Sequence, residues 1–276
     1  MARLGDLLKA GRVAAVRDYL LSEILPDAVD RVNKDFSPGR LVKLPRTLEP
    51  LPTAQRELSS YRTRIGTMLE YALSTAIDNA LRDKDAAFRL CFVSYHDYPD
   101  FVLRDADYLV VLRIEMKSVE SQSDEQAARF DAPTARIDPK RDLVLFVAWE
   151  WKETKIEGVD VEYPHIYAQV IVEASDLAKE RDRRLSGLRG EIRGEEVLVP
   201  STKQGGKLVP DPGNYGKFWR IVPPERWNAI DLSEPVRLFV EFLRQVDQKA
   251  LRTRMERRTT KKDRKSGGKQ GTLPPT

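Results

Sequence analysis

The feature that most constrains the fold is an apolar run, residues 108–114 (YLVVLRI), that leads directly into the charged side chains Glu115 and Lys117. A short run this rich in Val, Leu and Ile predicts a buried strand. Successive side chains of a strand alternate between the two faces of a sheet, so Glu115 and Lys117 share one face. A buried charge is costly unless another group pairs with it. We therefore expect opposite charges to converge where this strand ends.

Hydrophobic periodicity around this run predicts a mixed architecture. Apolar residues recur at helical spacing from Gln55 to about Arg82. Three short runs typical of strands follow, at 88–94, 100–104 and 108–117. After them come a polar segment at 122–130, which we expect to be helical, and a further strand at 142–151. A further strand and a charged helix come next. The predicted fold class is α/β of the mixed α+β kind, with a central mixed sheet in αβββαβ order flanked by helices.

Two further carboxylates are expected beside Glu115 and Lys117. Fourteen residues separate Asp100 from Glu115, and the polar turn RDAD between them allows a hairpin that brings the two carboxylates together. On the preceding helix, Glu70 lies at the edge of the apolar stripe, where the helix meets the sheet. Three acids in one low-dielectric pocket repel each other, so they take up protons or need a cation.

A divalent metal ion is the expected cation. The chain has one cysteine and two histidines, which excludes a site rich in those ligands. Carboxylate ligands alone favour Mg²⁺ or Mn²⁺ over zinc. Beside such an ion, Lys117 can orient or help deprotonate an attacking water and can neutralise charge that develops on a phosphate.

These residues resemble a known family. The segments RIGTMLEYAL, YPDFVL and RIEMKS are similar to motifs of the PD-(D/E)xK nuclease superfamily, which includes most type II restriction endonucleases. The resemblance covers about residues 55–151 and implies a restriction-endonuclease-like core. It implies that Asp100 and Glu115 are metal ligands, that Lys117 is a water-positioning base or electrostatic stabiliser, and that Glu70 is an accessory ligand or water anchor. It further implies hydrolysis of a DNA phosphodiester that leaves a 5′-phosphate and a 3′-hydroxyl, with Mg²⁺ as cofactor and Mn²⁺ as substitute.

Other interpretations of single residues remain open. An acid two residues before a lysine occurs six times in the chain. Glu150 and Lys152 form one of these pairs and also end an apolar run, so they are the strongest competing candidates, here called the decoy pair. Asp100 is also compatible with a turn, Lys117 with a snorkelling side chain and Glu70 with a solvated helix position. A loop histidine, His96, is an alternative aid to catalysis.

Charge and composition suggest four regions. We expect an N-terminal helical arm with a Pro-rich connector at 1–54, the nuclease core at 55–180, an auxiliary DNA-recognition region at 181–245 and a basic, disordered tail at 246–276. The net charge is +4, yet residues 244–269 carry 11 Lys/Arg against 3 Asp/Glu, so the positive charge lies in the tail. No segment resembles a membrane span or a signal peptide, which predicts a cytoplasmic protein without membrane association.

Double-stranded DNA is the expected partner. Reading bases and holding phosphates requires exposed basic and amide side chains. Candidates are concentrated in the Gly- and Pro-rich stretch 186–224, namely Arg189, Arg193, Lys203, Gln204, Lys207, Asn214, Lys217 and Arg220. A homodimer is expected because two-fold symmetry is the simplest way to cut both strands. The alternatives are a repair, recombination or other defence nuclease that nicks DNA or recognises a DNA structure, and a DNA-binding protein without catalysis.

Overall fold

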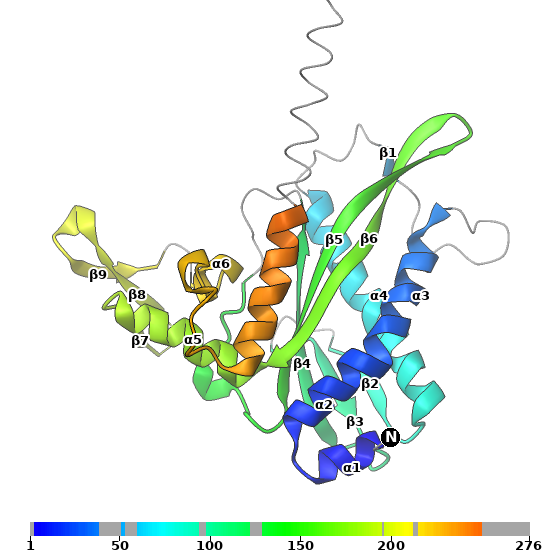
Figure 1. Ribbon diagram of the computed structural model, residues 1–276, viewed down its shortest axis with the longest axis horizontal. Coiled ribbons are helices and arrows are strands. Elements are labelled where there is room, and N and C mark those ends of the chain that lie inside the picture. The colour runs from blue at the N-terminus through cyan, green and yellow to red at the C-terminus, as the bar shows by residue number, and fades with distance from the viewer. Residues whose placement is uncertain are drawn as a thin grey trace, which may run out of the picture.

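The structure is a computed structural model that describes residues 3–38, 51–52, 60–93, 98–121, 129–194, 196–211 and 215–249. Its centre is a mixed sheet with helices on both faces, and a smaller three-stranded sheet stands to one side (Figure 1). This arrangement confirms the predicted mixed α/β class. No helix within these ranges is long and apolar enough to cross a membrane.

The N-terminal helices pack against the long helix α4. They are α1 (Leu4–Lys9), α2 (Val13–Tyr19), a π-helical turn (Leu20–Ile24) and α3 (Leu25–Phe36), and α4 spans Ser60–Lys84. Buried apolar side chains of the first group, such as Ile24 and Val32, belong to the same cluster as Leu69 and Leu73 of α4. The N-terminal helices therefore share one hydrophobic core with α4, which lies in the segment that resembles the nuclease superfamily.

The main sheet combines antiparallel hairpins with one parallel pair. Its order is β1-β6-β5-β4-β3-β2, and among these described strands only β4 and β5 run parallel. The strand bounds are β1 (Leu51–Pro52), β2 (Arg89–Phe92), β3 (Phe101–Arg104), β4 (Val110–Glu120), β5 (Asp142–Ile156) and β6 (Val159–Glu173). Strands β2–β6 contain the predicted apolar runs, whereas β1 lies in the predicted Pro-rich connector.

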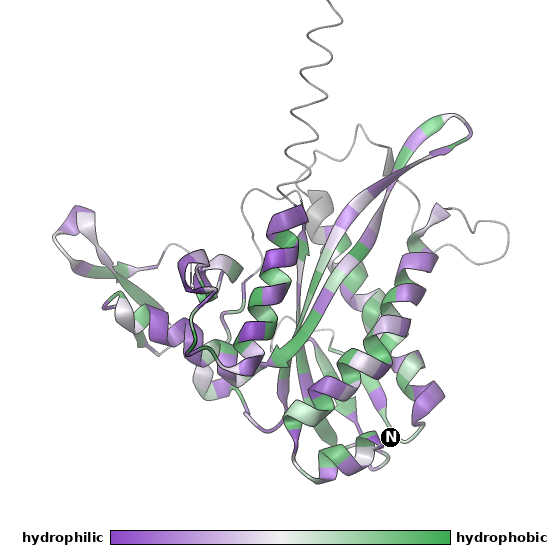
Figure 2. Ribbon diagram, viewed as in Figure 1, coloured by the Kyte–Doolittle hydropathy of each residue, from purple (hydrophilic) through white to green (hydrophobic). Residues whose placement is uncertain are grey.

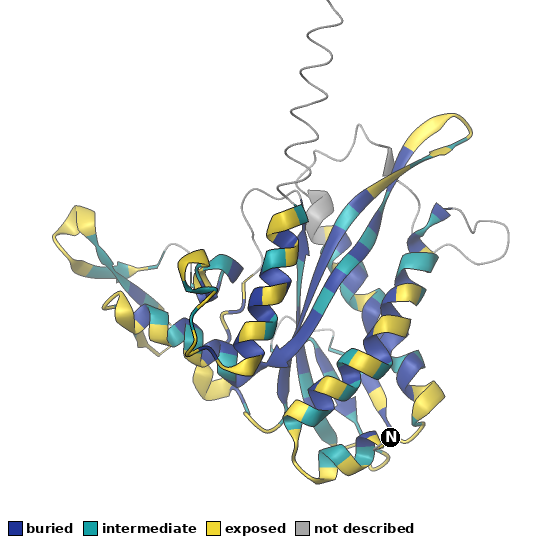
Figure 3. Cartoon of the chain, in the orientation of Figure 1, coloured by how far each residue is buried: buried dark blue, intermediate teal, exposed yellow. Residues whose placement is uncertain are grey.

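The two faces of the sheet carry separate cores. Ile114 and Met116 of β4 belong to the cluster under α1–α4, whereas Val119 of β4 and Phe146 of β5 belong to the cluster on the other face. Figures 2 and 3 show the buried apolar strands between the helices and the polar, exposed outer helix faces. By alternation, Glu115 and Lys117 point toward the second face.

Most of the helix predicted in the crossover between the parallel strands lies outside the described residues. A helix was expected at 122–130, but residues 122–128 lie outside the described ranges. Arg129 forms an isolated antiparallel bridge with Lys217 instead of a helical turn. Within residues 129–141, the described part of this crossover, the only helix is a 3-10 turn at Thr134–Arg136.

The hairpin β5–β6 is longer than the strand predicted at 142–151. The two strands stay paired up to Ile156 and Val159, beyond the body of the protein (Figure 1). Glu157 and Gly158 join them with φ values of 51° and 81°. Positive φ at both turn residues is the geometry of a type I′ turn, whose twist matches that of a hairpin. Backbone pairing therefore extends the strands past the apolar run.

The C-terminal part covers the second face and forms the small sheet. Its elements are α5 (Ala174–Gly187), β7 (Glu191–Arg193), β8 (Glu196–Ser201), a 3-10 turn (Thr202–Gln204), β9 (Lys207–Pro210), α6 (Phe218–Ile221), a 3-10 turn (Pro224–Arg226) and a helix at 234–249. Phe239 of that last helix packs on Phe146, with ring centroids 4.5 Å apart. The boundary expected between residues 180 and 181 falls inside α5. Most of the predicted tail, residues 250–276, lies outside the described ranges.

Candidate active site

The hairpin β3–β4 brings Asp100 and Glu115 together. Phe101 at the start of β3 pairs with Ile114 of β4, so Asp100, one residue before the strand, lies level with Glu115. The Asp100 carboxylate accepts a hydrogen bond of 2.7 Å from the backbone N–H of Met116. This register confirms the predicted hairpin. The backbone of β4 thus orients one carboxylate of the site.

Lys117 contacts both carboxylates. Its Nζ lies 2.5 Å from Glu115 Oε1 and 3.9 Å from Asp100 Oδ2. Glu115 is only 9% exposed, and its second oxygen, Oε2, is buried without a hydrogen-bond partner among the described residues. The three side chains form a compact charge cluster in which one carboxylate oxygen is unsatisfied.

Burial and neighbouring charges shift the ionisation of this cluster. Burial raises the pKa of Glu115 to about 7; the Lys117 ammonium opposes this shift and the Asp100 carboxylate adds to it. Burial by itself lowers the pKa of Lys117, but the carboxylates of Glu115 and Asp100 outweigh it, and the pKa is raised. A cation bound beside a buried carboxylate with a raised pKa would stabilise the charged form of that carboxylate.

Glu70 approaches the cluster from α4. Gly66 lies one turn earlier on the same helix face, and a Cβ there would lie 3.4 Å from Ser118 Oγ, so α4 comes close to β4 at this level. Burial raises the pKa of Glu70 to about 7; Asp100 adds to the shift and Lys117 opposes it. Glu70 is therefore within electrostatic reach of the cluster, yet it forms no hydrogen bond or ion pair within the described part of the chain.

The expected ligand set of three carboxylates is not assembled. Within the described ranges no three His, Cys, Asp or Glu side chains are gathered so as to hold a metal ion. The Lys117 ammonium contacts both Asp100 and Glu115. These two carboxylates still fit Mg²⁺, which commonly takes one or two carboxylates and keeps several waters, and the orphaned Glu115 Oε2 needs a partner. Glu70 interacts with these two carboxylates through its charge.

A neighbouring ion pair was missed by sequence reasoning. Asp142, the first residue of β5, is 1% exposed and is the register partner of Arg113, two residues before Glu115. Its carboxylate accepts hydrogen bonds from Arg113 Nε at 2.6 Å, from the Tyr98 hydroxyl at 2.9 Å and from the Asp138 backbone N–H at 2.8 Å. The sequence does show one charged residue in each of two apolar strands. It does not show that the two residues pair, because their pairing follows from the parallel register of β4 and β5.

This network predicts a large stability effect at Asp142. Asp142→Asn should lower the free energy of unfolding by about 3 kcal/mol, because it leaves the Arg113 guanidinium without its buried counter-charge. Denaturant unfolding measures the change. Asp138→Asn is the matched control; it weakens a partly exposed pair with Arg141, so a change below about 1 kcal/mol is expected. Equal changes for the two variants would contradict the structural role of Asp142.

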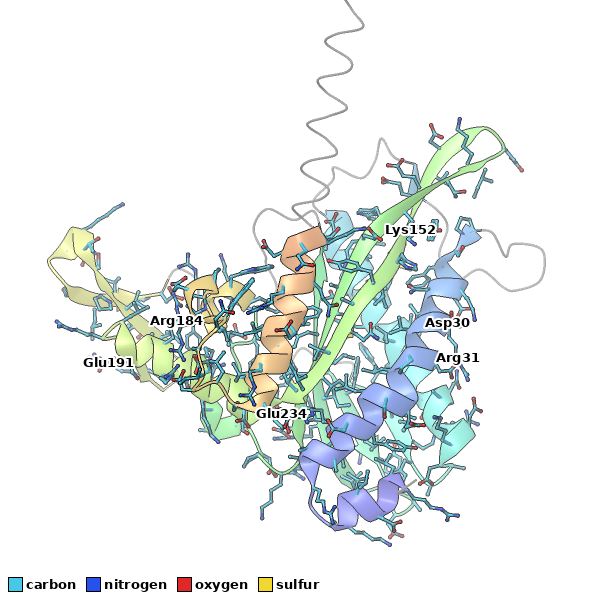
Figure 4. The ribbon with its side chains drawn as sticks, in the orientation of Figure 1. Asp30, Arg31, Lys152, Arg184, Glu191 and Glu234 are labelled. Carbon is cyan, nitrogen blue, oxygen red and sulfur yellow. The ribbon has the colours of Figure 1, made fainter. Side chains whose placement is uncertain are left out.

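The decoy pair lies in different surroundings. Glu150 Oε2 is bound by Lys249 Nζ at 2.6 Å, from the helix at 234–249. Lys152 is exposed and lies toward the projecting part of the β5–β6 hairpin (Figure 4). Neither residue has a hydrogen bond or ion pair to Asp100, Glu115 or Lys117 among the described residues. The other alternative, His96, lies outside the described ranges.

The predicted DNA-binding residues fall into two groups. The small sheet β7–β9 and its turns carry exposed side chains, namely Arg193, Lys203, Gln204 and Lys207, and Arg189 is exposed just before it. Arg193 is paired with Glu191 on the same strand. Lys217 and Arg220 lie instead at α6, and Asn214 is outside the described ranges.

Comparisons of the chain with protein-family models, with curated proteins and with solved structures find no match. Functional inference therefore rests on the side chains gathered at the β3–β4 hairpin and on the motif resemblance.

Proposed function

We propose that this protein is a Mg²⁺-dependent, sequence-specific DNA endonuclease of the restriction type. The observation that carries the proposal is the cluster of Asp100, Glu115 and Lys117, in which one ammonium contacts two carboxylates and Glu115 Oε2 has no partner among the described residues. A protein that only bound phosphate would have no use for converging carboxylates, because they repel the ligand.

Each residue of the cluster has a defined task in this proposal. Asp100 and Glu115 would hold Mg²⁺, with Mn²⁺ as a substitute; a bound ion supplies Lewis acidity toward the phosphate and lowers the pKa of a bound water. Lys117 is held by Glu115, so its ammonium can orient the attacking water and neutralise charge on the scissile phosphate. Glu70, within electrostatic reach, would anchor a water at the edge of the site.

Substrate binding is assigned to the C-terminal part. The exposed basic and amide side chains on β7–β9 provide donors of the types that contact phosphates and base edges. Cleavage of both strands at one site is most simply achieved by a homodimer, with one active site for each strand. We therefore propose duplex DNA as substrate and a dimer as the acting form.

Incubation with DNA tests the proposal directly. Plasmid and phage DNA are incubated with the protein in Mg²⁺, in Mn²⁺ and in excess chelator. Discrete fragments that need the metal, with 5′-phosphate ends, are the expected result. Nicks at mismatches or cuts at branched substrates would replace the restriction assignment with a repair or recombination nuclease. DNA binding without cleavage in either metal would reject the nuclease assignment.

A further inference from the structure

A cavity lined by arginines lies away from the β3–β4 cluster. It has a volume of about 180 Å³ and opens between α5, strand β8 and the segment that leads into α6. Figure 4 shows Arg184 on α5 facing this region, beside α6 and the small sheet. The cavity is lined by Arg181, Arg184, Leu185, Leu188, Val199, Asp211, Tyr215, Gly216 and Arg220.

One wall of the cavity is held rigidly. Arg181 is 2% exposed, and its guanidinium donates to the carbonyl oxygens of Phe130 and Ala132 at 3.1 and 2.9 Å. It also lies 4.4 Å from the centre of the Tyr215 ring. Gly216 has φ +76°, and a Cβ there would lie 2.3 Å from the Phe130 carbonyl oxygen, so only glycine permits this approach. The Arg181 guanidinium is thus used in contacts within the protein, and these contacts hold this wall of the cavity in place without a ligand.

The other two arginines are differently placed. Within the described part of the chain, neither Arg184 nor Arg220 has a side-chain hydrogen bond or ion pair. Burial lowers the pKa of Arg184, the positive charge of Arg220 lowers it further, and Glu225 and Asp211 only partly oppose this. Two guanidinium groups therefore face one cavity while they repel each other, an arrangement that an anion would stabilise.

The size and chemistry of the cavity favour one kind of anion. Room for a single water takes roughly 10–15 Å³, so a cavity of about 180 Å³ accommodates a much larger group. Guanidinium forks match the oxygen geometry of carboxylates and phosphates. A phosphate group offers enough oxygens to engage two forks at once, and its charge exceeds that of a carboxylate. The aliphatic side chains of Leu185 and Val199 can contact the apolar part of a ligand that carries the phosphate group.

We propose that this cavity is a phosphate-binding site in which Arg184 and Arg220 grip the ligand. The phosphate either belongs to a nucleic-acid strand or is carried by a small molecule. The site is separate from the cluster at Asp100, and its existence does not depend on nuclease activity.

The test compares three single substitutions in the full-length protein. Arg184→Gln and Arg220→Gln remove the gripping charges, whereas Arg183→Gln is the matched control on the same helix. Arg183 is already paired with Glu180 and Asp231 and does not line the cavity. Each protein is measured for thermal stabilisation by inorganic phosphate, and for binding of a short duplex in chelator over a range of salt. Unfolding curves without ligand identify any variant that fails to fold.

The outcomes separate the two phosphate sources. If a DNA strand supplies the phosphate, Arg184→Gln and Arg220→Gln weaken duplex binding about tenfold. They also reduce the slope of log K against log salt by about 0.9, the value for one lost phosphate contact, while Arg183→Gln does not. If phosphate stabilises the wild type but neither cavity variant, and duplex binding is unchanged, the site takes a small phosphorylated molecule.

If both cavity variants behave as the wild type in both assays, the proposal is overturned. A wild type that does not bind DNA at all would remove the proposed nuclease function, and the phosphate measurement would still decide the cavity.

Discussion

Glu115→Gln and Lys117→Ala are each expected to lower Mg²⁺-dependent DNA cleavage by about 10³-fold. Loss of one preorganised charge at a reacting centre commonly lowers the rate by 10²–10³, and Glu115 is at once a proposed ligand and the residue that holds the Lys117 ammonium. Rates are measured as the first-order loss of supercoiled plasmid at saturating Mg²⁺. Duplex binding in chelator should stay within a few-fold of the wild type, because the proposed phosphate and base contacts of β7–β9 remain in both variants.

The decoy pair supplies the matched controls. Glu150→Gln and Lys152→Ala make the same chemical changes in the same acid-x-lysine pattern, on β5. Glu150 is tied to Lys249 and Lys152 is exposed, so both variants should cleave at nearly the wild-type rate. If instead the Glu150 and Lys152 variants lost cleavage while the Glu115 and Lys117 variants kept it, the active site would have been assigned to the wrong strand.

The second large effect is expected at Arg17, a buried arginine with no hydrogen bond or ion pair to Asp100, Glu115 or Lys117 among the described residues. Its side chain is 1% exposed and donates two hydrogen bonds to Glu173 at 3.1 and 3.0 Å and one to Glu234 at 3.0 Å. It thus joins α2 to the end of β6 and to the start of the helix at 234–249. Arg17→Met should lower the free energy of unfolding by about 4 kcal/mol, because it leaves Glu173 buried without a counter-charge.

An exposed arginine provides the comparison. Arg31 lies on α3 (Figure 4). It pairs with Asp27 and Asp83, but its side chain is 37% exposed. Arg31→Met should change the free energy of unfolding by about 1 kcal/mol at most. Urea titrations followed by circular dichroism measure both variants. If Arg17→Met lowers the free energy of unfolding no more than Arg31→Met does, the buried ion pair of Arg17 contributes little beyond the cost of its own desolvation.

Elements with a strong local signal could be predicted from the sequence. The apolar spacing along α4 and the polar turn between Asp100 and Glu115 are each contained in a few consecutive residues. The structure has both the helix and the hairpin, with Phe101 opposite Ile114. Such features depend on backbone geometry over a short stretch, so a single sequence is enough to indicate them.

Pairs that join distant segments were not predictable in the same way. Arg113 and Asp142 meet only because β4 and β5 run parallel in one particular register. Glu150 pairs with Lys249 because the helix at 234–249, far along the sequence, packs on the same face of the sheet. The bridge between Arg129 and Lys217 is a further example, because it joins two segments that are far apart in the sequence.

The mixed α/β class, the hairpin and the common face of Glu115 and Lys117 follow from local sequence patterns, because side-chain alternation depends on the strand backbone alone. Packing between separate elements brings Lys117 to both carboxylates, places Glu70 within electrostatic reach of them, and forms the arginine-lined cavity beside α6. The physical reason is that these features depend on the packing of separate elements, where a shift of a few ångströms makes or breaks a charge contact.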